Sequence, residues 1–323
     1  DIADSTKTLD VDGGTIKLDG NYPTGTGNVA LGNTALDSVE AGGTYNVALG
    51  DAAGTAITTG DGNVGVGADA LLLNSSGGYN TALGTSSVRN NTTGNYNVGL
   101  GQGALYSNTT ASNNTAVGYQ AGFANTTGGN ITAVGRWALK ANTTGNDSTA
   151  VGLNALLSNT TGGSNIAVGQ QALQANTTAS YNTAVGYQAA YSNTTGADNT
   201  AMGTAALYPN TTGNYNAAFG SASLRQNTTG STNTALGQSA LNRNTTASNN
   251  TAVGYQAGYS NTTGGANSSV GRGSGYSTTT GANNTSMGYL SLATNTTAGD
   301  NTAVGYQAGY SRTGSGNTCV GNY

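Results

Sequence analysis

The sequence predicts an all-β fold, a parallel β-solenoid (β-roll) built from short coils. Three observations predict it: a repeat of constant length, apolar and glycine residues at fixed places in the repeat, and very little charge. Gly (53), Thr (53) and Asn (42) make up nearly half of the 323 residues, and only 7% are charged. A disordered low-complexity tract can have this composition, but it has no reason to keep a constant register.

The repeat is anchored on the glycine that closes each A-V-G or A-L-G triplet. From Gly50 to Gly305 this anchor glycine recurs every 17 residues. The consensus is N-T-A-V-G-x-x-A-L-x-x-N-T-T-G-x-x, and we number each coil from its anchor glycine as position 0. Helical repeats need about 33 residues or more, so a unit of this length predicts one coil of a β-solenoid.

Each coil is expected to contain two short strands and two turns. Thr-Ala-Val, at positions −3 to −1, is β-prone, and the anchor glycine permits a turn with positive φ. Ala-Leu, at positions +3 and +4, predicts a second short strand. Asn-Thr-Thr-Gly, at +7 to +10, predicts the second turn, with Asn and Gly in left-handed conformations. Coils stacked about 4.8 Å apart would form a rod of roughly 80 Å.

The repeat divides the chain into two parts. Residues 1–27 are expected to be an N-terminal shaft or entry segment. Residues 28–323 are expected to form a solenoid of about 17–18 coils of 17 residues that continues past the given sequence. The absence of an initiator Met fits a processed product or a fragment.

Two columns of residues are predicted to shape the coils. One is the turn glycines, among them Gly118, Gly135, Gly186 and Gly254. The other is the asparagines at position −4, among them Asn114, Asn182, Asn250 and Asn301. Stacked Asn side chains can hydrogen-bond from coil to coil; alternatively, Asn only tolerates the turn.

The strand pattern also bears on assembly. Neighbouring strand residues point to opposite faces, so Ala and Val of Thr-Ala-Val face different ways. One face can fill the coil, and the other is small and apolar. We expect this face to contact a second copy, because so thin a coil has little core of its own. The alternative is a single solenoid with harmlessly exposed Ala and Thr.

The composition excludes most chemistry. Without His, and with Cys319 as the one cysteine, the chain has no zinc site, His-based triad or internal disulfide. Asp10, Asp12 and Asp19 lack the spacing of a calcium loop. We therefore expect no enzyme activity and no cofactor or metal. A net charge of −4 indicates no nucleic-acid partner, and no apolar run of about 18 residues predicts membrane insertion.

Tyrosine supplies the candidate binding residues. Aromatic rings beside Asn and Arg commonly hold sugars by stacking and hydrogen bonds. The candidates for glycan contact stand at positions +1 and +5: Tyr119, Tyr187, Tyr255, Tyr306, Tyr259 and Tyr310. The alternative is that these rings pack over turns. The Asn-Thr-Thr triplets also match the N-glycosylation pattern, whose use depends on the host.

The unit N-T-A-V-G-Y-Q-A-G-Y-S-N-T-T-G, residues 250–264, resembles the head repeats of trimeric autotransporter adhesins, which form trimeric β-rolls from a shorter coil. It is also similar to repeats of bacteriophage tail fibres, and residues 15–32 look like a fibre shaft entering such a repeat. The resemblance implies a homotrimeric structural fibre in a virion tail. Its partners would be other tail proteins and a host cell-surface glycan or protein. The alternative is a bacterial surface adhesin.

Ice binding is a further alternative, because flat β-solenoids with Thr arrays can order water. Two features of the repeat argue against it. The turn threonines are adjacent, as in Thr126 and Thr127, and would point in different directions. The strand threonine forms one column only, and Val often replaces it.

Overall fold

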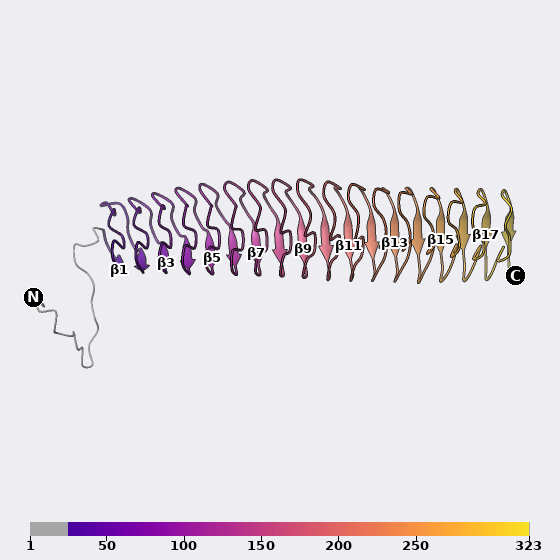
Figure 1. Cartoon of the computed structure of the whole chain (residues 1–323), viewed down its shortest axis with the longest axis horizontal. Helices are drawn as coiled ribbons and strands as arrows, with labels where there is room; N and C mark the ends of the chain where they lie inside the picture. Colours follow the sequence, from indigo (N-terminus) through magenta and orange to yellow (C-terminus); the bar gives the residue numbers. More distant parts are fainter. Residues whose placement is uncertain (1–24, 323) are drawn as a thin grey trace, which may run out of the picture.

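A computed structural model describes residues 25–322, and these form 18 strands of three residues each. The strands recur once per coil along an elongated rod (Figure 1). Their bounds are β1 (Val29–Leu31), β2 (Val47–Leu49), β3 (Val64–Val66), β4 (Thr81–Leu83), β5 (Val98–Leu100), β6 (Thr115–Val117), β7 (Thr132–Val134), β8 (Thr149–Val151), β9 (Ile166–Val168), β10 (Thr183–Val185), β11 (Thr200–Met202), β12 (Ala217–Phe219), β13 (Thr234–Leu236), β14 (Thr251–Val253), β15 (Ser268–Val270), β16 (Thr285–Met287), β17 (Thr302–Val304) and β18 (Thr318–Val320).

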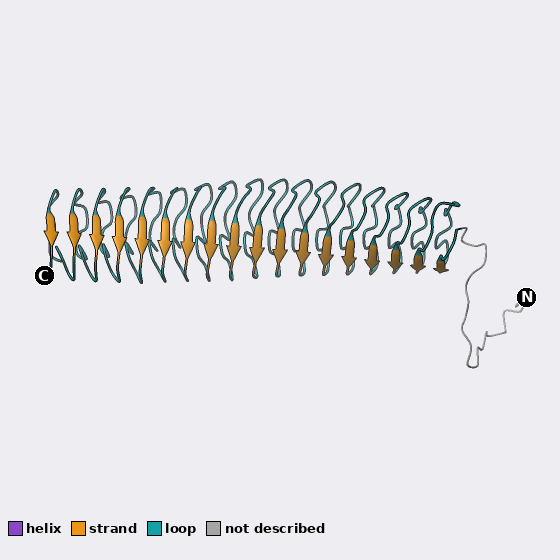
Figure 2. Cartoon of the chain, turned by 180° about the vertical axis from the view of Figure 1, so that it is seen from behind, coloured by secondary structure: helices purple, strands orange, loops and turns teal. Residues whose placement is uncertain are grey.

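The strands form one parallel sheet in which each strand pairs with the next along the chain. The pairing keeps equivalent repeat positions opposite each other, for example Ala116 of β6 against Ala133 of β7. Figure 2 shows the strands in a single row, with loops closing each coil behind them. The predicted parallel β-solenoid is therefore confirmed, and the segment 1–24 lies outside the described residues.

The predicted second strand is wrong. The Ala-Leu segment consists of turns, because residues at +2 and +4 adopt positive φ, as in Gln120 (52°) and Leu105 (51°). Neighbouring coils nevertheless stay paired there: the Leu105 N–H donates to the Ala121 carbonyl at 3.0 Å. Only Gly, and to a lesser degree Asn and Asp, visits this backbone region routinely, so a repeated Leu gives no local signal of it.

The turn glycines behave as predicted at the anchor but not at Asn-Thr-Thr-Gly. Gly118 has φ of 130°, and a Cβ placed there would lie 2.8 Å from the carbonyl carbon of Gly135 in the next coil. Both the backbone angle and the close approach of coils therefore require glycine. In Asn-Thr-Thr-Gly, by contrast, neither Asn125 nor Gly128 has positive φ. The non-glycine left-handed residues stand at −5, +2 and +4 instead.

The apolar core is a narrow column inside the coils. The strand Ala (position −2), the Ala at +3 and the Leu at +4 are fully buried in most coils, as with Ala116, Ala121 and Leu105. Where Gly replaces Leu at +4, a neighbouring Leu takes the space. A Cβ on Gly122 would meet Leu105 Cδ2 at 3.0 Å. The two residues at +4 thus share one cavity across adjacent coils, which keeps the core closely packed.

The rest of the interior is filled by asparagine. At position −4 the backbone N–H of Asn80 donates to Asn63 Oδ1 (3.0 Å), and Asn80 Nδ2 donates to the same oxygen (3.1 Å). The asparagines predicted for this column, Asn114, Asn182, Asn250 and Asn301, are all buried, and each donates its backbone N–H to the Asn Oδ1 one coil earlier. The ladder interpretation is confirmed for this column.

The asparagines at position +7, which the sequence predicts only as turn residues, form a second ladder. At position +7, Asn91 Nδ2 donates to Asn74 Oδ1 at 2.6 Å. The two ladders meet at the carbonyl of position +10, since Asn80 Nδ2 and Asn91 Nδ2 both lie 2.9 Å from the Gly94 oxygen. Burying an amide without a hydrogen bond costs free energy. In coils such as this one, the −4 and +7 amides both donate to the +10 carbonyl, which links the two sides of the coil.

The second ladder has a gap at Thr278. All the remaining coils from Asn74 to Asn295 carry Asn at this position. Before the gap, Asn261 Oδ1 is buried and has no hydrogen-bond partner. After the gap, Asn295 Nδ2 donates to the Ala298 carbonyl but finds no asparagine oxygen one coil earlier. The core is also unusual there: Ser274 replaces the usual Ala and hydrogen-bonds to Ser286 Oγ (2.7 Å). This region therefore lacks one step of the second ladder.

We predict that Thr278→Asn stabilises the chain by about 1–2 kcal/mol, because it restores the missing ladder member and gives Asn261 Oδ1 a donor. The measurement is urea unfolding of the full chain followed by circular dichroism. Thr280→Asn, at an exposed position of the same turn, is the matched control and should change nothing. Equal midpoints for the two variants would contradict the assignment of Thr278 as a ladder gap.

Candidate binding surface

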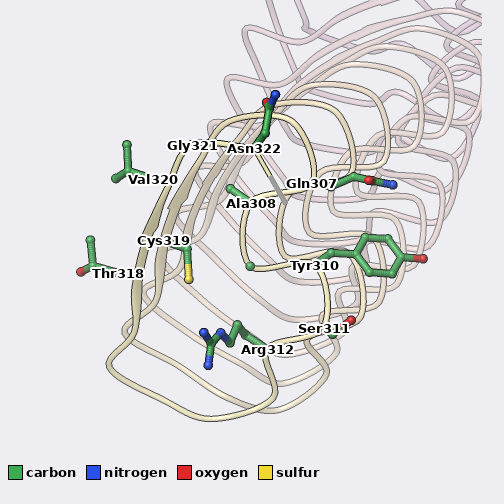
Figure 3. Close-up of a pocket in the computed structure, with 11 residues that line it drawn as sticks. Gln307, Ala308, Tyr310, Ser311, Arg312, Thr318, Cys319, Val320, Gly321 and Asn322 are labelled. Atoms are coloured by element: carbon green, nitrogen blue, oxygen red, sulfur yellow. The ribbon is translucent and has the colours of Figure 1, made fainter.

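The solenoid presents two opposite outward surfaces. We call the outward side of the strands, positions −3 and −1, the sheet face. The turn wall comprises positions +1, +2 and +5. Figure 3 shows the last coils end-on: Thr318 and Val320 of the sheet face point away on one side, and Gln307 and Tyr310 of the turn wall point the opposite way. The hollow between them, which Cys319 lines, is the coil interior seen from its end.

The six candidate tyrosines fall into two environments on the turn wall. Those at +1 are exposed, with 42–53% of their surface accessible: Tyr119, Tyr187, Tyr255 and Tyr306. Those at +5, Tyr259 and Tyr310, are half-buried, and Tyr259 stacks on Tyr276 with ring centroids 5.2 Å apart. At +1, Tyr306 also stacks on Tyr289, with ring centroids 5.3 Å apart. The packing alternative therefore describes Tyr259 and one side of Tyr306, while the exposed surfaces of the +1 rings stay available for a ligand.

A third tyrosine column is the most exposed, and it was not among the candidates. It stands at position −5, with 58–66% of each side chain accessible: Tyr45, Tyr79, Tyr96, Tyr181 and Tyr215. Tyr79 and Tyr96 stack in parallel at 5.3 Å. One sequence signal could have found this column, because Asp147, Asp198 and Asp300 occupy the same position in other coils. Charged residues seldom stand at buried positions.

Cations gather on the aromatic rings of the turn wall. The Arg136 guanidinium lies 3.8 Å from the Trp137 ring centroid, and Lys140 Nζ lies 5.0 Å from it. Farther along the rod, Arg272 lies 5.8 Å from the Tyr255 ring and 5.7 Å from the Tyr289 ring. Cation–π contacts of this kind hold the charged groups in place on the surface.

The Asn-Thr-Thr triplets are unsuited to N-glycosylation once the chain is folded. Asn125 is fully buried, and its Nδ2 donates to Asn108 Oδ1 (2.9 Å) and to the Gly128 carbonyl (2.8 Å). The amide nitrogen that would carry the glycan is therefore enclosed and occupied. The adjacent threonines differ as expected: Thr126 Oγ1 donates to the Thr143 carbonyl, while Thr127 is exposed.

The described coils offer few side chains for metal binding. Residues 25–322 contain no group of three or more Cys, Asp or Glu side chains placed to hold a metal ion. The same residues include no helix of the length and apolarity that a bilayer span needs. Asp10, Asp12 and Asp19 lie outside the described part of the chain. The exposed rings of the turn wall can stack on a ligand and its cations can pair with an anion, and both are binding functions.

Comparison with protein-family models, with curated proteins and with solved structures finds no match to this chain. Its function must therefore be argued from the surfaces themselves.

We predict that the two tyrosines of one coil differ in their structural role. Tyr191, at +5, stacks on Tyr208 (5.2 Å), so Tyr191→Ala should lower the free energy of unfolding by about 1 kcal/mol. Tyr187, at +1 of the same coil, is exposed, and Tyr187→Ala should leave stability within about 0.5 kcal/mol of the wild type. Urea unfolding measures both. A larger loss for Tyr187→Ala would show that the +1 rings are packing residues.

Proposed function

We propose that this chain is a non-enzymatic structural fibre, a segment of a phage tail fibre that serves attachment to the host surface. The observation that carries the proposal is the unbroken in-register stack from β1 to β18, which makes a rod with a repeating surface. Such a solenoid is stabilised by nearest-neighbour contacts between coils and can extend without a globular core. Its use is to hold a binding surface at a distance.

The fibre is proposed to be a homotrimer joined through the sheet face. No charged residue stands at −3 or −1 in the described coils, and several large apolar side chains there are exposed, including Leu83, Met202, Leu236 and Met287. A strip about 80 Å long and about 10 Å wide presents roughly 800 Å² per chain. That equals one partner's share of a standard protein interface. The resemblance to trimeric adhesin heads favours three chains.

Joining the sheet faces leaves the turn wall outward. In each of three chains the exposed +1 tyrosines and their neighbouring cations would then face the medium, where a host cell-surface glycan or protein can reach them. Other virion tail proteins would contact the ends of the rod. The location proposed is the virion tail.

The alternative is a trimeric adhesin on a bacterial surface, which would use the same coil and the same two surfaces. The fold favours neither. A gene neighbourhood of tail proteins would support the phage fibre, and a membrane anchor encoded in the same gene would support the adhesin.

The trimer predicts a mass three times 31.6 kDa in multi-angle light scattering. Leu236→Glu should reduce it to the mass of one chain, because 49% of Leu236 is exposed on the sheet face and three carboxylates would meet at the trimer axis. The control, Thr246→Glu, changes an exposed turn residue of the same coil and should remain a trimer. Circular dichroism verifies that both variants keep the fold. A wild-type chain that is monomeric would overturn the proposed assembly.

A further inference from the structure

Two adjacent coils carry an aromatic and basic group of residues on the turn wall, which we call the Trp137 cluster: Tyr119, Gln120, Arg136, Trp137 and Lys140. Trp137 is the one tryptophan of the chain. Its Nε1–H donates to Gln120 Oε1 at 3.2 Å, which fixes the ring across the coil boundary. The Tyr119 ring lies against it, tilted by 53° with a centroid distance of 6.5 Å.

The cluster concentrates positive charge that no carboxylate of residues 25–322 pairs with. Arg136 and Lys140 both lie within 5.0 Å of the Trp137 ring centroid. The described residues offer neither of them a carboxylate at salt-bridge distance, whereas Arg89 pairs with Asp69 at 3.5 Å. Two cations held against one indole ring without a counter-ion repel each other, and a bound anion would relieve that repulsion.

The aromatic groups give the cluster its second property. A guanidinium stacked on an indole face keeps its N–H groups in its own plane, where they can form a two-bond contact with a carboxylate. Beside it, 42% of Tyr119 is exposed, and it offers a ring on which an apolar sugar face can stack. Cations beside an open ring are the combination that recognises a sugar bearing a carboxylate.

We propose that the Trp137 cluster binds an acidic glycan, with Arg136 and Lys140 pairing with a sugar carboxylate and Tyr119 stacking on the pyranose ring. Trp137 and Gln120 act as positioning residues. The inference rests on the proposed function and specifies its ligand class. Positions +2 and +5 point away from the sheet face (Figure 3), so the trimer would present three copies, and a long polysaccharide could engage more than one.

The charge balance favours a glycan over a nucleic acid. Binding to a phosphate backbone needs many distributed cations, and this chain has a net charge of −4 with 9 basic residues in total. A neutral glycan has no negative charge to pair with Arg136 and Lys140. The acidic sugar is the ligand that uses both the rings and the charges.

The test uses the full-length trimer and isothermal titration calorimetry with three carboxylated probes: oligogalacturonate, hyaluronan oligosaccharides and polysialic acid oligosaccharides. At least one probe should bind, and Arg136→Gln/Lys140→Gln should weaken its binding at least tenfold. For oligogalacturonate, the methyl-esterified oligomer is the matched neutral probe. Tyr119→Ala and Trp137→Ala should also weaken binding. Arg225→Gln, which removes an exposed turn-wall cation elsewhere, is the control and should bind as the wild type does.

Several outcomes would overturn the site. These are no binding to any acidic probe at millimolar concentration, binding that the double variant retains, equal affinity for esterified and free oligogalacturonate, or tighter binding to single-stranded DNA. Light scattering on the same samples separates the two proposals. A trimer that binds no acidic glycan rejects the Trp137 cluster and leaves the proposed fibre, whereas a monomer rejects the trimeric assembly whatever it binds.

Discussion

The structure depends on the hydrogen bonds that buried asparagine amides make between neighbouring coils. A coil of this size encloses only a column of Ala and Leu, so apolar burial alone specifies its register weakly. The amide columns supply the missing specificity, because a shifted coil would leave a buried Oδ1 or Nδ2 without a partner. Where Ile57 and Thr278 replace the +7 asparagine, the interval stays at 17 residues and the −4 column continues through Asn63 and Asn284.

The same constraint shapes the surface. Because amides and small apolar groups fill the interior, every charge in the described coils stands on an outward position. Charge is absent from the sheet face and present on the turn wall and at the −5 loop. One surface is thereby suited to another chain and the opposite one to a ligand. The proposed fibre, with one surface for assembly and the opposite one for binding, would follow from one coil repeated along the axis.

Much of this arrangement could be predicted from the sequence, and the rest could not for identifiable reasons. The 17-residue spacing, the β-prone Thr-Ala-Val and the inward Ala are local patterns. Leu105 in a left-handed conformation opposes local preference, and only the packing of adjacent coils selects it. Asn is also a common turn residue, so Asn91 gives no local sign of a ladder. Its ladder bond is made to Asn74, one coil earlier. The Trp137 cluster joins side chains of two coils, and the repeat spacing does not reveal that contact.

The most direct test of the account is hydrogen exchange of asparagine side-chain amides, followed by NMR on the full chain. Asn80, Asn91 and Asn97 of the two ladders are buried and donate their Nδ2 hydrogens to coil partners, whereas Asn113 and Asn249 are exposed. The account predicts that the ladder amides exchange at least about 100-fold more slowly than the exposed ones. Equal exchange rates in the two groups would contradict it, because the coils would then lack the interaction that sets their register.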